Sequence, residues 1–359
     1  MTSRCVRSMV SAVLAAAATV AAAHADPCPP LQILASVPMS YDTAGRPFVP
    51  VTLATAHKLM LIDTGGALSE ISQHLATELG LYHRKVRVRQ YNMSGQYTDE
   101  AADVSPFAIG NLVADHTELM IAPDNFKYAN DGAGGIIGPN ILRNYDAEFD
   151  FGGNTFKLIS QEHCAGKVIY WPTATTAAVP MRISRDIGHI FVPVTLDGIA
   201  LNALIDTGAS TTFVPSWVAE DDFHLQLGSA DAPAIDSLPG ATGASVFKHR
   251  FHSLSVEGIV VSNPLISIFP DLMHHAMPRK SPYGTRIPET DEPQGLNEVT
   301  LGIDVLKRLH LYIAYKEEML YATPAGPAPA EVPAPSPAMA GGVPSNPHTA
   351  VIALAPRMP

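Results

Sequence analysis

The chain has 359 residues, of which 47% are hydrophobic and 16% charged, and a chain of this length and composition can form two domains with cores of their own. Its formal net charge of −11 makes it a poor candidate for binding nucleic acid or an anionic membrane surface.

Residues 1–25 have the features of an export signal. Arg4 and Arg7 form a basic start, residues 9–22 are a run of mainly Ala, Val and Leu, and residues 23–25 form a small-x-small cleavage site. Removing this segment takes away two arginines and no acid, which leaves a net charge of −13. No later stretch is apolar for long enough to span a bilayer. We therefore expect a periplasmic or secreted protein with no membrane span in the mature chain.

Two cysteines, Cys28 and Cys164, remain after the signal is removed. An exported protein meets a compartment that permits oxidation, so a disulfide could tie the N-terminal segment, residues 26–36, to the end of the first half of the chain. The alternative is a pair of unlinked buried cysteines. Their spacing does not suggest a metal site.

The first half opens with a Pro-rich tether, residues 26–36, that ends in a strand. A strand with alternating faces is predicted over residues 48–53. The next apolar run, residues 59–62, ends abruptly in Asp63, Thr64 and Gly65, which places a carboxylate on a sharp turn at the end of a buried strand. A single such turn would usually be only a solvated strand end.

The segments after this turn predict a helix and a hairpin. Ser72 can cap a short helix over residues 73–79 that ends at Gly80. Residues 86–91 alternate apolar and polar side chains and run into a turn at 92–96, as in a hairpin with an exposed tip.

The first half closes with an alternating strand pair over residues 147–159. Residues 165–178 contain Gly, Pro, Thr and Ala with little to pack, and we expect them to be a linker between two halves.

The motif occurs a second time, where the apolar run 202–205 ends in Asp206, Thr207 and Gly208. The strand before the motif is copied too, because residues 191–196 repeat residues 48–53 at the same offset of 143 that separates the two aspartates.

Further elements of the first half have counterparts in the second. Residues 137–143 align without a gap on residues 301–307, and Pro215 stands in the first turn of a helix through Ala219. The second half also carries an insertion at residues 277–297, rich in Pro, Gly and charge, which we expect to be a surface loop. The chain is therefore a tandem duplication, in which two copies can bring one carboxylate each to a pseudo-twofold axis.

Two copies of Asp-Thr-Gly stand behind an apolar strand, and each is followed some 70 to 100 residues later by two apolar residues and a Gly, at 136–138 and, less cleanly, at 300–302. This pattern resembles the aspartic proteases. The bacterial retropepsin-like branch fits best, here as two fused lobes. The resemblance implies an all-β bilobal pepsin-like fold, with lobes at residues 37–164 and 179–323 and an active-site cleft between them. The Pro- and Ala-rich tail, residues 324–359, lies outside it and is predicted to be disordered.

The resemblance also assigns site residues. Asp63 and Asp206 are expected to hold one water, with one carboxyl protonated and the other ionised, as aspartic protease pairs do. Which acid holds the proton is left open, because the pair titrates as a unit. In the family, the threonines at the positions of Thr64 and Thr207 bond across to the opposite loop.

Gly65 and Gly208 are expected to let the two loops approach closely. The hairpin matches the flap of the family, so Tyr91, Met93, Gly95 and Tyr97 are flap candidates. The implied partner is a protein or peptide substrate, the implied state is a monomer that acts as an internal pseudo-dimer, and no metal or other cofactor is implied.

One departure from the family pattern has chemical content. Many pepsin-like members carry Ser or Thr after Asp-Thr-Gly, and its hydroxyl favours the ionised carboxylate, whereas this chain has Gly66 and Ala209. We therefore expect the pair to ionise less readily and activity to lie at weakly acidic to neutral pH.

Two other functions fit parts of the sequence. A binding protein on the same fold that has lost catalysis could hold a peptide or envelope partner, although both acids and both glycines are present. Residues 62–66 also resemble the phosphate-binding turns of the actin-like sugar kinases and ATPases, but such an enzyme would need helices where this sequence has short strands and turns.

Overall fold

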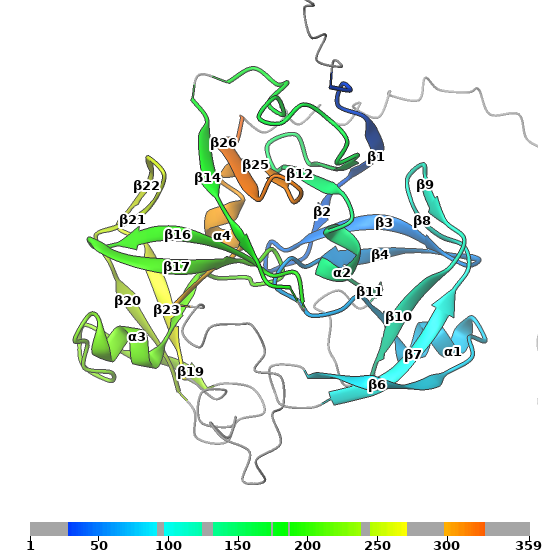
Figure 1. The fold of residues 1–359 in the computed structure, drawn as a ribbon. Coiled ribbons are helices and arrows are strands. Elements are labelled where there is room, and N and C mark those ends of the chain that lie inside the picture. Colours follow the sequence, from blue (N-terminus) through cyan, green and yellow to red (C-terminus); the bar gives the residue numbers. More distant parts are fainter. Residues whose placement is uncertain are drawn as a thin grey trace, which may run out of the picture.

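The computed structural model describes residues 28–91, 97–123, 132–173, 175–185, 187–237, 245–270 and 298–326. They form two all-β lobes joined by a third sheet (Figure 1). The expected surface loop at 277–297 and almost all of the predicted tail lie outside these residues.

The first lobe is one ten-stranded sheet, coloured blue to cyan in Figure 1, with the strand order β6-β7-β10-β5-β11-β4-β3-β8-β9 and β2 paired beside β3. Its strands are β2 (Ser40–Tyr41), β3 (Pro47–Leu53), β4 (Ala56–Ile62), β5 (Glu70–Ser72), β6 (Arg84–Tyr91), β7 (Tyr97–Val104), β8 (Phe107–Ile109), β9 (Leu112–Ala114), β10 (Thr117–Ala122) and β11 (Ala133–Ile137).

The second lobe repeats this sheet strand for strand, in the order β19-β20-β23-β18-β24-β17-β16-β21-β22 with β15 beside β16. Its strands are β15 (Arg182–Ile183), β16 (Ile190–Leu196), β17 (Ile199–Ile205), β18 (Phe213–Pro215), β19 (Ala234–Ser237), β20 (Ser245–Arg250), β21 (Ser253–Val256), β22 (Ile259–Ser262), β23 (Leu265–Phe269) and β24 (Val299–Leu301). The shared order is what a tandem duplication of one folding unit produces.

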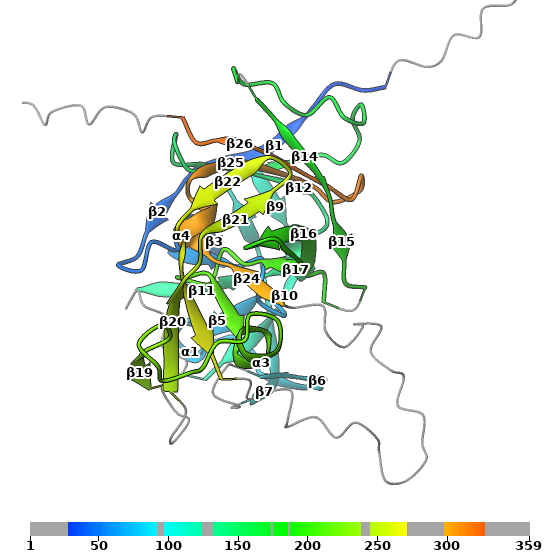
Figure 2. The same cartoon turned by 90° about the vertical axis from the view of Figure 1, so that its left-hand side faces the viewer.

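A six-stranded antiparallel sheet takes strands from both halves and joins the lobes, as the two views in Figures 1 and 2 show. Its order is β1 (Ile33–Pro38), β13 (Thr155–Ile159), β12 (Asp146–Asp150), β25 (Leu309–Ala314), β26 (Met319–Pro324) and β14 (Ala177–Pro180). At its centre Ala147 pairs with Ile313 and Phe149 with Leu311. Ala147 corresponds to Leu311 in the repeat and Phe149 to Ile313, so a twofold axis through this point exchanges the two pairs.

The described residues contain four short helices, which form two pairs in the repeat. They are α1 (Gln73–Glu78), α2 (Pro139–Leu142), α3 (Ser216–Asp221) and α4 (Ile303–Leu306). Helix α1 corresponds to α3, and α2 corresponds to α4. The predicted cap of α1 is present, because the Ser72 hydroxyl accepts a hydrogen bond of 3.3 Å from the Leu75 N–H. Pro215 was predicted inside the first turn of α3, but it is the residue before that turn, and the helix continues to Asp221.

The expectation that residues 165–178 have little to pack is wrong. Val168 is fully buried in a small core formed with the central sheet. The Trp171 ring stacks on His310 with 3.9 Å between ring centroids, and its Nε1–H donates to the Thr323 hydroxyl at 3.1 Å. These contacts fasten the crossing between the halves to the sheet that joins them.

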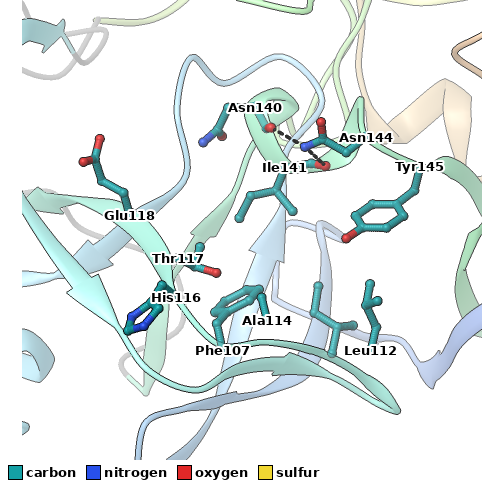
Figure 3. A pocket seen from close by; sticks show the side chains of 11 residues that line it. Phe107, Leu112, Ala114, His116, Thr117, Glu118, Asn140, Ile141, Asn144 and Tyr145 are labelled. Carbon is teal, nitrogen blue, oxygen red and sulfur yellow. Dashed lines mark hydrogen bonds between the residues drawn. The ribbon is translucent and has the colours of Figure 1, made fainter.

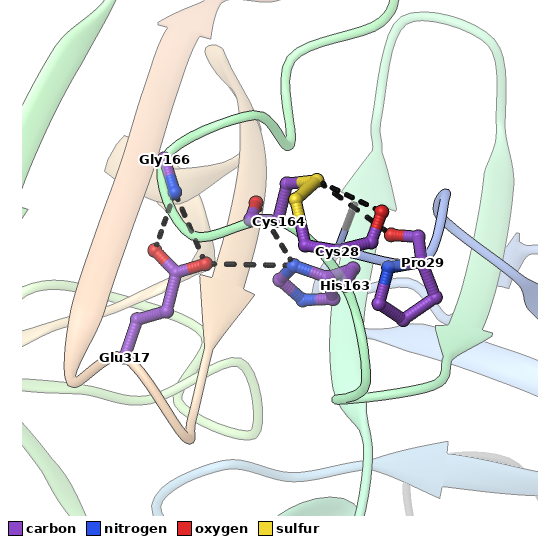
Figure 4. Close-up of a disulfide and its surroundings, with 6 residues drawn as sticks. All are labelled: Cys28, Pro29, His163, Cys164, Gly166 and Glu317. Atoms are coloured by element: carbon purple, nitrogen blue, oxygen red, sulfur yellow. Dashed lines mark hydrogen bonds and ion pairs between the residues drawn. A yellow bond between two sulfur atoms is a disulfide. The ribbon is translucent and has the colours of Figure 1, made fainter. Parts of the chain in front are cut away.

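Cys28 and Cys164 form a disulfide with their Cα atoms 5.1 Å apart, so that the segment before β1 is tied to the segment after β13 (Figure 4). The neighbouring His163 is buried, with its Nδ1 3.5 Å from Glu317 Oε1 and its Nε2 2.6 Å from Asp146 Oδ2. The disulfide thus lies beside a buried polar cluster at the end of the central sheet.

Candidate active site

The two Asp-Thr-Gly turns leave their sheets at equivalent points. Each aspartate directly follows the long central strand of its lobe, β4 or β17, which pairs in parallel with β11 or β24. The Asp63 N–H donates to the Ile137 carbonyl at 3.0 Å, and the Asp206 N–H donates to the Leu301 carbonyl at 3.1 Å. Each turn is therefore fixed at the end of a buried ladder of strands rather than left as a free loop.

The structure brings the two carboxyl groups face to face. A Cβ atom placed on Gly65 would lie 2.2 Å from the Cγ of Asp206, and one placed on Gly208 would lie 2.3 Å from the Cγ of Asp63. The two carboxyl groups are close enough for each to influence the pKa of the other. Each glycine is therefore required by the approach of the opposite acid, because no side chain fits in that space.

Two buried threonines cross-link the turns. The Thr64 hydroxyl donates to the Ile205 carbonyl at 2.6 Å and accepts from the Thr207 N–H at 3.1 Å. In the same way, the Thr207 hydroxyl donates to the Ile62 carbonyl at 2.7 Å and accepts from the Thr64 N–H at 3.2 Å. Both side chains are fully buried. This is the crossed pair expected from the sequence, and it fixes the separation of the two acids.

Backbone N–H groups of each turn donate hydrogen bonds to the carboxyl group of the same turn. Gly65 donates to Asp63 Oδ1 at 3.0 Å, and Gly208 and Ala209 donate to Asp206 Oδ1 at 2.8 and 2.9 Å. Each turn thus holds its own carboxyl group by main-chain donors, which favour the ionised form of that group.

Burial is the main influence on the pKa of both acids. Burial raises the pKa of Asp63, while the hydrogen bond with Asp206, the N–H groups of Gly66 and Gly65, and the charge of His189 oppose that rise. Burial and then the negative charge of Asp63 raise the pKa of Asp206 well above its ordinary value. Two acids this close cannot both ionise at once, so one proton is shared between them over a range of pH.

Behind each turn lies a second set of matched bonds that the sequence reading missed. The Ser69 N–H and hydroxyl both donate to Asn140 Oδ1, at 2.8 and 2.7 Å, and the Gly138 N–H donates to the Ser69 hydroxyl at 2.9 Å. In the second lobe, the Thr212 N–H and the Thr212 hydroxyl both donate to Asp304 Oδ1, each at 2.8 Å. Ser69 and Thr212 are 143 residues apart, so the offset of the repeat was the signal that could have found them.

The predicted flap hairpin is present as β6 and β7, in which Tyr91 pairs in register with Tyr97. Tyr97 is 47% exposed, and the Arg89 guanidinium lies 5.0 Å above its ring. Met93 and Gly95 belong to the tip, residues 92–96, which lies outside the described residues. The role of these residues over the dyad therefore stays a prediction.

The base of this hairpin is attached to the loop that follows the first dyad turn. Gln90 is buried, and its Nε2 donates to the Leu68 carbonyl at 3.3 Å and to the carboxylate of Glu70. Leu68 and Glu70 follow the turn that carries Asp63, so these hydrogen bonds link the base of the hairpin to the segment just after that turn.

A cavity of about 290 Å³ lies elsewhere, in the first lobe between the β8–β9 hairpin, the start of β10 and α2 (Figure 3). Phe107, Leu112, Ile141 and Tyr145 are among its lining residues, and the Asp-Thr-Gly turns do not contribute to it. The cavity is therefore separate from the dyad.

Within the parts of the chain that the structure describes, no cluster of His, Cys, Asp or Glu side chains is arranged to hold a metal ion. In the same residues, no helix has the length and apolar character needed to cross a membrane.

Comparisons with known proteins bear on the fold. A family model described as aspartyl protease matches residues 192–305, which carry the second Asp-Thr-Gly turn. No curated protein matches the chain by sequence. Among solved structures, the chain is similar to an aspartic proteinase from Irpex lacteus, with a TM-score of 0.50 at 12% identity over 82% of this chain and 98% of that one.

The chain is also similar to basic 7S globulin from soybean, with a TM-score of 0.46 at 12% identity over 83% of this chain and 95% of that one. The strand order of the two lobes and the likeness to the Irpex lacteus proteinase show that the chain has the all-β bilobal fold of the pepsin-like aspartic proteases.

Proposed function

We propose that the protein is an exported aspartic endopeptidase that hydrolyses peptide bonds with a water held between Asp63 and Asp206. The observation that carries this proposal is the meeting of two carboxyl groups from equivalent turns, each against the glycine of the opposite turn. The proposal includes action outside the cytoplasm, on protein or peptide substrates, by a monomer.

The chemistry needs a base for water and an acid for the scissile carbonyl within one small volume. The ionised carboxylate takes a proton from the water, whose oxygen attacks the carbonyl carbon. The protonated carboxyl hydrogen-bonds the carbonyl oxygen as that oxygen gains charge. The proton taken from the water then passes to the leaving amine, the C–N bond breaks, and no acyl-enzyme forms.

An extended peptide is the substrate that suits this arrangement. β6 is the edge strand of the first sheet, and an edge strand can pair with an added strand through main-chain hydrogen bonds. The link from Gln90 to Leu68 and Glu70 holds this hairpin to the turn that carries Asp63. A substrate paired with the hairpin would therefore be positioned relative to one of the two acids.

The proposal predicts cleavage of denatured casein that a statine-type inhibitor blocks and that Asp63→Asn or Asp206→Asn abolishes. Asp115→Asn, at an exposed position, is the matched control and should cleave as the wild type does. A wild-type protein that binds the inhibitor or a peptide without cutting at any pH would instead indicate a non-catalytic binding protein.

The pH dependence of cleavage follows from the raised pKa values of the dyad. Burial raises the pKa of both acids. The carboxylate that acts as the base is therefore protonated, and inactive, already at a higher pH than an ordinary aspartate would be. We therefore expect the rate of cleavage to peak at weakly acidic to neutral pH. A profile of kcat/KM against pH that peaks at about pH 2, where strongly acidic dyads work, would contradict this expectation.

A further inference from the structure

The carbonyl group of Gly66 is held differently from its counterpart in the second lobe. There, the Ala209 carbonyl accepts a hydrogen bond of 2.8 Å from the N–H of Ile303, the first residue of α4. In the repeat, Gly66 corresponds to Ala209 and Pro139 to Ile303. Proline has no N–H, so the first lobe cannot make the equivalent bond.

The side chain of His189 supplies a donor in its place. Its Nε2 lies 3.0 Å from the Gly66 oxygen, and because a carbonyl oxygen only accepts, this nitrogen carries the proton. His189 directly precedes β16, so this bond runs from the second lobe to the turn that carries Asp63.

A tight turn holds His189 in position. The Ser184 hydroxyl accepts from the N–H groups of His189 and Gly188 at 3.0 and 3.1 Å. The imidazole ring is half-buried and lies edge-on to Phe191. A Cβ on Gly188 would lie 3.2 Å from that of Pro139, so the turn packs on α2 beside the position that lacks the N–H.

The equivalent residue in the first lobe behaves differently. Arg46 stands 143 residues before His189, and its Nε pairs with Asp42 Oδ2 of its own turn at 2.8 Å. The two halves of the dyad are therefore supported unequally, and the ionisable imidazole stands on the side of Asp63.

We propose that His189 is a positioning residue that replaces the N–H missing at Pro139, fixes the turn of Asp63, and directs the proton shared by the dyad to Asp206. Asp63 is then the ionised acid that takes the proton from water, and Asp206 is the acid that faces the scissile carbonyl. This inference rests on the proposed function for its catalytic consequence.

The charges around the turn support this direction. The charge of His189 is among the influences that lower the pKa of Asp63, and it is not among those that act on Asp206. The other charged groups at this turn include Arg185, whose carbonyl accepts from the Arg143 guanidinium at 3.2 Å. Both of these residues are cations.

The test compares four variants by titration of the dyad. Carbon-13 NMR of aspartate-labelled protein follows the carboxyl signals, which are assigned by their loss in Asp63→Asn and Asp206→Asn. His189→Gln keeps a donor without the charge, His189→Leu removes both, and His189→Leu with Pro139→Ala restores a backbone N–H. Arg46→Gln is the control at the equivalent position.

We expect His189→Gln and His189→Leu to raise the lower apparent pKa of the dyad by about 0.5 or more, with the same shift in the acid limb of kcat/KM. The plateau of kcat should stay near wild type in His189→Gln and fall roughly tenfold in His189→Leu, because a loosened turn misplaces its acid. Adding Pro139→Ala to His189→Leu should restore the plateau of kcat, but the acid limb of the kcat/KM profile should stay shifted.

The inference is overturned if the dyad titrates identically in wild type and His189→Leu, or if Arg46→Gln shifts it as much. The titration does not depend on turnover. A wild-type protein that cleaves nothing, but whose dyad shifts as described, would contradict the proposed function and uphold the assignment of the proton.

Discussion

At the scale of single residues, the glycines of the two turns are as specific as the acids. A Cβ on Gly208 would overlap the Asp63 carboxyl group, so Gly208→Ala should force the turns apart and lower kcat by about a hundredfold or more. Gly326→Ala, where a Cβ would meet nothing within 4 Å, is the control. Casein cleavage by folded Gly208→Ala at the wild-type rate would show that the turns need not approach closely.

The crossed threonines should contribute to both stability and rate. Thr64→Val would leave the buried Ile205 carbonyl and Thr207 N–H without their partner, at a cost of about 1–3 kcal/mol in unfolding free energy. Thr64→Ser keeps the hydroxyl and should retain most of that stability. Denaturant unfolding of the two variants makes the comparison, and a Thr64→Val variant as stable as wild type would contradict a role of the hydroxyl in stability.

The acids, threonines and glycines of the dyad could be predicted from the sequence because the motif occurs twice at one offset. Ser69 and Thr212 could have been found by the same offset. His189 was harder to find, because it matters through a difference between the copies. The structure shows that the Ile303 N–H donates to the Ala209 carbonyl. The equivalent Gly66 carbonyl accepts from His189 instead, because Pro139, at the position of Ile303, has no N–H.

At the scale of elements, local patterns predicted the strands, the capped helix α1 and the β6–β7 hairpin. They failed for residues 165–178, whose Thr- and Ala-rich sequence indicated a loose linker. Val168 and Trp171 pack there on a sheet built from both ends of the chain, and no local pattern reveals that partner. The alternation of strand residues likewise does not say which strands meet across the pseudo-twofold axis.

The same sheet contains a buried carboxylate whose ionisation stabilises the fold. Burial alone would raise the pKa of Glu148, but hydrogen bonds from His310, Lys157 and Tyr170 hold it below its ordinary value. A carboxyl group with a lowered pKa stabilises the folded state above its unfolded pKa of about 4.3, and that contribution is lost as the pH falls through the folded pKa.

We therefore expect the free energy of unfolding of wild type to exceed that of Glu148→Gln at pH 7, and the difference to shrink as the pH falls below about 4.3. Glu220→Gln, at an exposed position on α3, is the control and should follow wild type. Denaturant unfolding at a series of pH values gives the comparison. A difference that stays constant with pH would mean that the charge of Glu148 contributes nothing.

At the scale of the whole molecule, two copies of one unit share a single site that neither contains alone. Each copy provides one acid, and its threonine holds the turn of the other copy. The central strands β12 and β25 belong to different halves of the chain and pair in a register that is symmetric about the twofold axis. This pairing sets the orientation of one lobe relative to the other. The symmetry is broken at the dyad, where His189 reaches the turn of Asp63 and Arg46 stays with Asp42.

The central claim is that Asp63 and Asp206 act as one catalytic unit. Its most direct test measures kcat/KM for Asp63→Asn, Asp206→Asn and the double variant, with folding checked by thermal unfolding. Groups that act as a unit are not additive, so each single variant should lose about a thousandfold or more and the double variant should lose no more than either. Losses that multiply in the double variant, or substantial activity in either single variant, would contradict the claim.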